Sequence, residues 1–226
     1  MNISVIIPTL NEGAAIAEVI AQARMTATPS VIEVIVCDGG SHDDTCARAR
    51  VVADKVLTSA VGRSRQMHAG ALAATGDLLV FLHADTRLPD GWAAIVKEAW
   101  ARSSAPVAAA FALGFDQDGF FYRMITVTAG WRQRLTGVPQ GDQAIVVSKA
   151  AYFAVGGFPD VPLLEEYGLI RKLKGMGRIV RLPARVLTSA RRYEKNGRLW
   201  NNLRSTIIVA LYYCGVSEER LACLYR

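Results

Sequence analysis

Asp85 follows a short apolar run in the stretch LLVFLHADTRLPDGW at residues 78–92. Five apolar residues that end in His83, Asp85 and Thr86 predict a buried strand with a carboxylate at its C-terminal end. In an open α/β sheet, ligands bind at that end of the strands. The pattern therefore predicts that Asp85 belongs to a ligand site.

Polar and turn-forming residues also follow two earlier apolar runs, as PTLNE at 8–12 and DGGSHDD at 38–44. Gly39 and Gly40 allow close backbone approach, and Asp38 offers an acceptor for base or ribose donors. Such convergence at neighbouring strand ends is what a nucleotide pocket needs, although DGGS alone is equally consistent with a plain turn. The absence of GxGxxG and GxxxxGK[ST] argues against a dinucleotide dehydrogenase and a P-loop enzyme.

Secondary-structure elements must position these residues. The sequence of the first half predicts alternating strands and helices. The order predicts a parallel sheet with right-handed crossovers. Ser41, with Asp44 three residues later, is expected to cap the second helix. The predicted strands are 3–8, 31–36, 55–59 and 78–82, and the predicted helices are 12–24, 41–53 and 64–75.

The second half is less regular, and we expect it to form one continuous unit with the first, without a linker or an internal repeat. The expected single domain, 1–226, has a nucleotide-binding half at 1–90, an acceptor half at 91–195 and C-terminal helices at 196–226. The predicted helices are 91–102, 120–135, 149–156, 163–177, 199–213 and 217–226, and the predicted strands are 105–115, 144–148 and 178–183.

Composition supports one α/β domain with a sizeable core, since the 226 residues are 51% hydrophobic and 20% charged. The net charge of +6 suits anionic ligands such as nucleotides, or an acidic membrane surface. No helix-turn-helix or aromatic-basic signature favours nucleic acid. The N-terminus reads as a strand, the four cysteines lack metal-site spacing, and no apolar run is long enough to span a bilayer, so we expect a cytoplasmic protein.

Together the motifs resemble the family 2 glycosyltransferases of the GT-A fold. IIPTLNE at 6–12, CDGGSHDDT at 37–45, GRSRQMHAGALAATGD at 62–77 and LHADT at 82–86 carry the resemblance. GDQAIV, GGFPDVPLLEE and TSARRYEKNG are similar to a small bacterial subgroup associated with arsenosugar biosynthesis and radical-SAM enzymes. The resemblance implies an α/β fold with a mostly parallel Rossmann-like half, a mixed-sheet acceptor half and C-terminal helices.

The resemblance also implies inverting transfer of a sugar from a UDP- or GDP-sugar to a hydroxyl acceptor, assisted by Mg²⁺ or Mn²⁺. Family members end the fourth strand in Asp-x-Asp, whereas here His83 takes the first position and Asp85 remains as the metal ligand. His83 is either a second ligand or a hydrogen-bond partner of ribose or backbone. The implied donor-binding residues are Pro8, Thr9, Asn11, Glu12, Asp38, Gly39, Arg63, Arg65, Gln66, His83, Ala84, Asp85 and Arg192.

On the acceptor side, Glu165 and Glu166 open a predicted helix where the family pattern is Glu-Asp. The resemblance makes Glu166 the catalytic base and Glu165 an acceptor contact, and the helix N-terminus is expected to lower the pKa of Glu166 and keep it ionised. Gly168 is expected to loosen this helix locally. The expected acceptor-binding residues are Gly141, Asp142 and Gln143.

Several alternatives stay open. Arg191, Arg192 and Tyr193 either contact the diphosphate or form a basic flank that orients the protein peripherally on an acidic inner membrane face. The closing helices either cover the core and form a dimer contact or meet a membrane. A nucleotidyltransferase of related fold is disfavoured because PTLNEGAA has no basic residue. A catalytically weakened nucleotide-sugar binder is kept open by the two departures from the family pattern.

Overall fold

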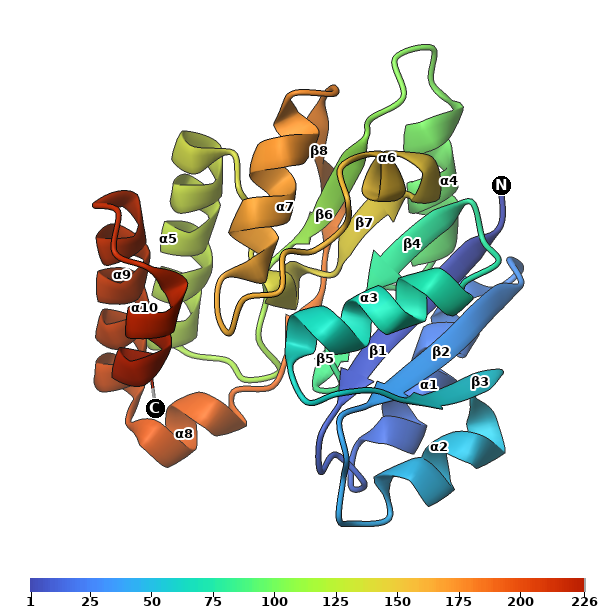
Figure 1. Ribbon diagram of the computed structural model, residues 1–226, viewed down its shortest axis with the longest axis horizontal. Coiled ribbons are helices and arrows are strands. Elements are labelled where there is room, and N and C mark those ends of the chain that lie inside the picture. The colour runs from blue at the N-terminus through green and yellow to red at the C-terminus, as the bar shows by residue number, and fades with distance from the viewer. Residues whose placement is uncertain (226) are drawn as a thin grey trace.

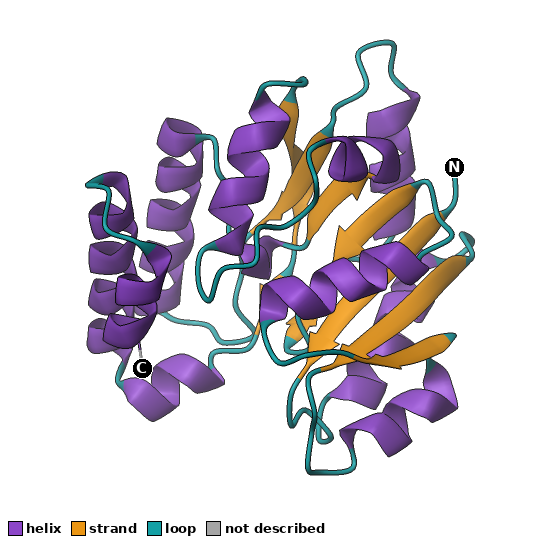
Figure 2. Ribbon diagram, in the orientation of Figure 1, coloured by secondary structure: helices purple, strands orange, loops and turns teal. Residues whose placement is uncertain are grey.

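The computed structural model describes residues 1–225, and for residues 192, 195, 196, 198, 199 and 201 it describes the backbone alone. A mixed sheet of seven strands, in the order β3-β2-β1-β4-β7-β6-β8, carries helices on both faces (Figures 1 and 2). One apolar core packs the sheet against α1 and α4, and a second packs it against α3, α6 and α7. The predicted α/β class is confirmed.

The first four strands are parallel, as predicted, and their carboxyl ends lie at one edge of the sheet. Gly70 lets α3 approach β1 closely, because a Cβ there would lie 2.4 Å from Ile6 Cγ2. The contact brings the start of α3 beside that edge. The elements are β1 (Ile3–Thr9), α1 (Ile16–Ala27), β2 (Ile32–Asp38), α2 (Thr45–Val52), β3 (Lys55–Thr58), α3 (Arg63–Ala73) and β4 (Leu78–Phe81).

The predicted cap of the second helix at Ser41 is wrong. α2 begins at Thr45, because the Ser41 hydroxyl donates to Asp38 and accepts the backbone N–H of Asn11 at 2.8 Å. Asp43 accepts the backbone N–H of Thr45 at 3.0 Å instead. The segment 41–44 is therefore part of the loop from β2 to α2, and its hydrogen bonds to Asn11 hold it against the loop that follows β1.

In the second half, β7 runs antiparallel to β4 and β6, and β6 pairs in parallel with β8. The chain therefore forms the mixed half that was predicted. The elements are α4 (Trp92–Ala101), β6 (Ala108–Ala112), α5 (Phe120–Thr136), a 3₁₀ turn (Gly141–Gln143), β7 (Ile145–Ser148), α6 (Lys149–Ala154), α7 (Glu165–Lys174), β8 (Ile179–Arg185), α9 (Arg198–Tyr213) and α10 (Glu218–Tyr225).

Two small features were not predicted. β5 (Thr86–Arg87) pairs antiparallel with β9 (Leu187–Thr188), and the helix α8 (Arg191–Asn196) follows. The backbone N–H of Ser189 donates to the Asp85 carbonyl at 2.9 Å. A segment a hundred residues away in sequence is thereby tied to the end of β4.

Gly168 does not loosen α7, contrary to the expectation. A Cβ at this position would lie 2.7 Å from Pro159 Cγ, so the missing side chain lets the preceding loop pack directly on the helix. This contact positions the loop at 159–162 above α3.

Helices α5 and α9 stand side by side at the end of the molecule away from β3 (Figure 1). Their outer surfaces expose Trp131 by 65% and Trp200 by 60%, whereas Trp92 and Trp100 are buried in the core beneath α4. No helix in the described part of the chain combines the length and apolar character needed to cross a membrane.

Candidate active site

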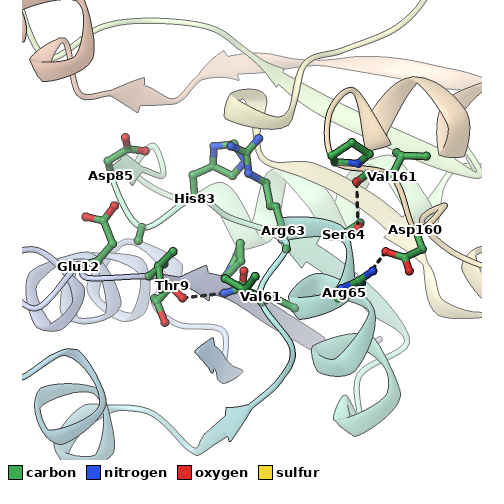
Figure 3. A pocket seen from close by; sticks show the side chains of 16 residues that line it. Thr9, Glu12, Val61, Arg63, Ser64, Arg65, His83, Asp85, Asp160 and Val161 are labelled. Atoms are coloured by element: carbon green, nitrogen blue, oxygen red, sulfur yellow. Dashed lines mark hydrogen bonds and ion pairs between the residues drawn. The ribbon is translucent and has the colours of Figure 1, made fainter. Parts of the chain in front are cut away.

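A first cavity of about 580 Å³ opens at the carboxyl ends of β1 and β4. The start of α3 and the loop at 160–162 close its other sides. Figure 3 shows Arg63 and His83 projecting into the same space, with Glu12 and Asp85 beside them and the Arg65–Asp160 pair at the far side. The sequence motifs thus meet in one concave site.

A second cavity of about 330 Å³ adjoins the first, and Arg63, His83 and Asp85 line both. Residues of α5, α7 and α9 contribute to its remaining walls, together with the 3₁₀ turn and the segment around β9. Any molecule in one cavity would therefore meet a molecule in the other at these three side chains.

Of the thirteen residues expected to bind the donor, nine line the first cavity. Asn11, Asp38 and Gly39 lie behind it and shape its loops, and the side chain of Arg192 lies outside the described part of the structure. The nine are Pro8, Thr9, Glu12, Arg63, Arg65, Gln66, His83, Ala84 and Asp85.

Asp38 is buried, and its carboxylate is occupied by the turn that follows β2. It accepts the backbone N–H groups of Gly40 at 2.9 Å and Ser41 at 2.7 Å, and the hydroxyls of Thr9 and Ser41. Burial alone would raise the pKa of Asp38, but these hydrogen bonds outweigh it and lower the pKa below its ordinary value. The carboxylate therefore holds the loop in its present shape.

Gln66 and the two arginines of α3 connect neighbouring walls. Gln66 Nε2 donates to the carbonyls of Thr9 at 2.7 Å and Cys37 at 2.8 Å, joining α3 to the ends of β1 and β2. Arg65 Nε donates to Asp160 at 2.7 Å, and Arg63 Nη1 lies 3.5 Å from Glu165 Oε1. Arg63 reaches the cavities, whereas Arg65 mainly holds the covering loop.

Asp85 and Glu12 share the cation of Arg191. Arg191 Nη2 lies 2.7 and 2.6 Å from the two carboxylate oxygens of Glu12, and 3.9 Å from Asp85 Oδ2. Arg191 comes from α8, so the segment after the last strand does reach the end of β4. The side chains of Asp85 and Glu12 are 16% and 20% exposed.

The residues at this point fit a divalent cation that is held jointly with a substrate. Across the described residues, no three carboxylate, imidazole or thiolate groups converge into a metal cluster. Asp85, flanked by His83 and Glu12, offers one or two oxygen ligands. Mg²⁺ and Mn²⁺ sites commonly use that number and take the remaining ligands from phosphates and water.

Glu166 lines the second cavity, and its expected lowered pKa is wrong. Burial, followed by repulsion from Glu165, raises the pKa of Glu166 from 4.5 to about 8. The helix N-terminus is too weak to offset this desolvation. Glu165 lies behind Glu166, is almost fully buried and lines neither cavity.

The three residues expected to bind an acceptor separate in the structure. Gly141 and Asp142 line the second cavity, and a Cβ on Gly141 would lie 3.0 Å from His83 Nε2. Gln143 is buried outside it, where its amide donates to Phe111 O and Gln133 Oε1, both at 3.0 Å. Gln143 thus holds the 3₁₀ turn that presents its two neighbours.

The covering loop and the helical wall were not predicted from the sequence. Pro162, with Asp160 and Val161, lines the first cavity, and the Gly156–Gly157 pair before them was an available loop signal. Arg132 of α5 lines the second cavity, but a lone arginine within a helix has no sequence signature.

Comparison with known proteins agrees with this architecture. The model of the family described as Glycosyl transferase family 2 matches residues 4–158. Glucosyl-3-phosphoglycerate synthase from Mycobacterium tuberculosis, in complex with Mn²⁺, UDP and glucosyl-3-phosphoglycerate, has a TM-score of 0.64 and 23% identity, covering 96% of this chain and 81% of that chain. Its complex with Mn²⁺ and UDP-glucose has a TM-score of 0.63 and 23% identity, covering 96% and 80%. No curated protein matches the sequence significantly.

Proposed function

The chain belongs to glycosyl transferase family 2, and on that premise we propose that it moves a sugar from a UDP- or GDP-sugar to a hydroxyl acceptor with inversion at the anomeric carbon. The observation that carries the proposal is the junction of the two cavities at Arg63, His83 and Asp85. A donor in the first cavity and an acceptor in the second would meet there. The family makes the chain a glycosyltransferase, and the donor, the base and the stereochemistry are what we add.

The first cavity suits the nucleotide diphosphate. The first turn of α3 lines it, and a helix N-terminus with an adjacent arginine favours phosphate oxygens. The similar synthase was crystallised with Mn²⁺ and UDP-glucose. By analogy, Asp85 would hold Mg²⁺ or Mn²⁺ together with the diphosphate, with His83 and Glu12 near enough to assist.

When bound, the cation supplies Lewis-acid stabilisation of the negative charge on the departing diphosphate. The protein's own contribution there is Arg63, which faces both cavities, and Arg191, which lies 3.9 Å from Asp85. Both add positive charge at the place where the leaving group becomes anionic.

Glu166 acts as the general base in this proposal. Its carboxylate takes the proton of the acceptor hydroxyl while the hydroxyl oxygen bonds to the anomeric carbon from the second cavity. The bond from that carbon to the diphosphate oxygen breaks, and its electron pair leaves with the nucleoside diphosphate. Attack from the face opposite the leaving group inverts the configuration.

A base with a pKa of about 8 is half ionised at mildly alkaline pH and retains an ionised fraction at neutral pH. General-base catalysis is most efficient when the pKa lies near the operating pH. Glu166 therefore suits the role better with its raised pKa than it would as a permanently ionised surface carboxylate.

The finer predictions stay predictions. They are the arsenosugar-associated subgroup, a homodimer through the closing helices, and peripheral contact with the inner face of a membrane. We also treat residues 1–226 as one catalytic unit with a nucleotide-binding half at 1–90, an acceptor half at 91–195 and C-terminal helices at 196–226. Residues from both halves line each cavity, which supports a single unit, and the first cavity is lined mainly by residues 8–85 and the second mainly by residues 113–225, which supports the division of labour.

The test is calorimetry of UDP and GDP binding with Mn²⁺ or EDTA, followed by a screen of nucleotide sugars for donor turnover. The wild type should bind one nucleotide in a metal-dependent manner, and Asp85→Asn should lose the metal dependence while remaining folded. Glu98→Gln is the control, because Glu98 pairs with Arg102 on the exposed surface of α4 and lines neither cavity. Equal metal dependence in Asp85→Asn and the wild type would remove Asp85 from the site, and nucleotide binding without turnover would favour the weakened-binder alternative.

A further inference from the structure

Arg132 of α5 places a guanidinium group on the wall of the second cavity. Among the described residues, it has no ion pair, and its Nε is buried without a hydrogen-bond partner. The other site arginines differ, since Arg63 faces Glu165, Arg65 pairs with Asp160, and Arg191 pairs with Glu12. The protein leaves the charge of Arg132 to be balanced from within the cavity.

Tyr167 does not balance this charge. The phenol lies close enough for Arg132 to lower its pKa, but burial has the larger effect and raises that pKa well above the ordinary value. Tyr167 therefore stays neutral at working pH. A guanidinium that is partly removed from water and left unpaired is unfavourable, so an anion that enters the cavity gains a ready partner.

The cavity around Arg132 is small, and its walls from α5 and α9 mix apolar side chains with hydroxyl and amide side chains. Ala129 and Ile125, about one and two turns before Arg132 on α5, line a volume of about 330 Å³ together with Ile208 and Val209 of α9. That volume is at the lower end of small-molecule sites. It suits a compact molecule rather than an extended chain.

The position of the carboxylates gives the cavity two ends. Glu166 and Asp142 come from the start of α7 and the 3₁₀ turn, near the junction with the first cavity, and Arg132 comes from α5. Arg63, at the junction, already faces Glu165, so an anionic group is attracted to Arg132, which has no ion pair among the described residues. We propose that the acceptor is a compact molecule whose carboxylate or phosphate group pairs with Arg132 while its hydroxyl reaches Glu166. This inference rests on the proposed function.

A guanidinium recognises both carboxylate and phosphate through two parallel hydrogen bonds. The pairing would do more than add affinity, because it would fix which end of the acceptor faces the donor. Arg132 is thus a specificity-determining residue, distinct from the groups that take part in bond exchange.

The experiment compares matched acceptors with the wild type, Arg132→Gln, Arg132→Lys and Arg134→Gln, after a donor has been found. Glucose 6-phosphate is paired with glucose, and glyceric acid is paired with its methyl ester. Arg134 is the control, because it is exposed on the same helix and lines neither cavity. Donor affinity is measured in parallel by calorimetry of UDP with Mn²⁺.

We expect the wild type and Arg134→Gln to prefer an anionic acceptor over its neutral partner by about 10- to 100-fold in kcat/KM. Arg132→Gln should lose this preference through KM and keep its affinity for UDP, and Arg132→Lys should retain part of it. The phosphate and carboxylate pairs show which anion is preferred. An unchanged preference in Arg132→Gln, or a wild type that favours neutral acceptors, would overturn the inference. Absence of nucleotide binding in every variant would overturn the proposed function beneath it.

Discussion

The two cavities meet at three side chains but are built differently. Loops that follow parallel strands form most of the first cavity, and buried side chains such as Asp38 and Gln66 bind the backbone of those loops. Helices α5, α7, α8 and α9 supply the largest share of the second, and their side chains line it directly. The shape of the first cavity depends mainly on backbone geometry, and that of the second depends mainly on which side chains line it.

The two kinds of construction suit two kinds of ligand. A backbone cradle restrained by hydrogen bonds suits a ligand with a constant part, such as a nucleotide diphosphate. A helical wall changes its chemistry with every substitution, since each residue projects on its own. We therefore expect substitutions in the first region to act on loop shape and stability, and those in the second to act on rate and acceptor choice.

Glu166→Gln should have the largest effect. General-base catalysis contributes about 10²- to 10⁴-fold, so transfer should fall by at least about a hundredfold. Affinity for the donor should stay unchanged, because Glu166 lines only the second cavity. Single-turnover rates with a confirmed donor measure the effect, and Glu166→Asp is the partner variant that should keep substantial activity. Near-normal transfer in Glu166→Gln would mean that another group is the base.

The pH dependence should be the next largest effect. With a pKa of about 8 for Glu166, kcat/KM should rise nearly tenfold per pH unit below that value and level off above it. Since repulsion from Glu165 helps to raise this pKa, Glu165→Gln should move the midpoint of the profile to lower pH. If the midpoint of the pH profile is the same in Glu165→Gln and the wild type, the group that titrates is not Glu166 coupled to Glu165.

The same shift predicts how the stability of the free protein changes with pH. Between pH 4.5 and about 8, folded Glu166 holds a proton that the unfolded chain has released, so its contribution to stability falls as pH rises. Glu166→Gln has no such proton to lose. Denaturation across this range should show that the free energy of unfolding of the variant increases relative to that of the wild type as pH rises. A constant difference between the two would contradict the raised pKa.

Asp38→Ala should have a moderate effect, mainly on the first region. It leaves the N–H groups of Gly40 and Ser41 without their buried acceptor, at about 1–3 kcal/mol. For a chain of this length, each kcal/mol corresponds to about 2–4 °C in Tm. Weaker nucleotide binding should accompany the lower Tm. Full thermal stability with weak nucleotide binding would instead favour the direct base contact that the motif suggested.

Gly168→Ala should give the smallest effect. Its Cβ would lie 2.7 Å from Pro159 Cγ, and overpacking costs about 1–3 kcal/mol, of which the better helix propensity of Ala recovers about 1. Gly130→Ala on α5 is the control, since its Cβ meets only the movable end of Arg181 at 3.4 Å and should stabilise. A higher Tm in Gly168→Ala would show that the loop at 159–162 moves aside freely.

The sequence was most informative about the first region, where strand ends and loop residues are local in the chain. Alternating apolar runs predicted the parallel strands, and the family resemblance implied the nine residues that line the first cavity. Ser41 was misplaced because its hydroxyl bonds to residues of two loops instead of its own helix. No local pattern could indicate that choice of partner.

Predicting the second region required knowledge of long-range packing. The raised pKa of Glu166 depends on burial by several helices, whereas a helix-start pattern by itself suggests the opposite direction. Arg132 resembles any solvated helix residue until α5 is placed beside α7 and α9. The β5–β9 pair was missed because each strand has only two residues and their partners are far apart in sequence.

The distribution of the four tryptophans gives the protein two separate fluorescent populations. Trp92 and Trp100 lie in the dry core, where emission is blue and shielded from soluble quenchers, and Trp131 and Trp200 lie in water on α5 and α9. Trp131 is the direct neighbour of Arg132. Acrylamide should therefore quench only the red-shifted component of the native emission. With Trp200→Phe that component would come from Trp131 alone, beside the wall of the second cavity.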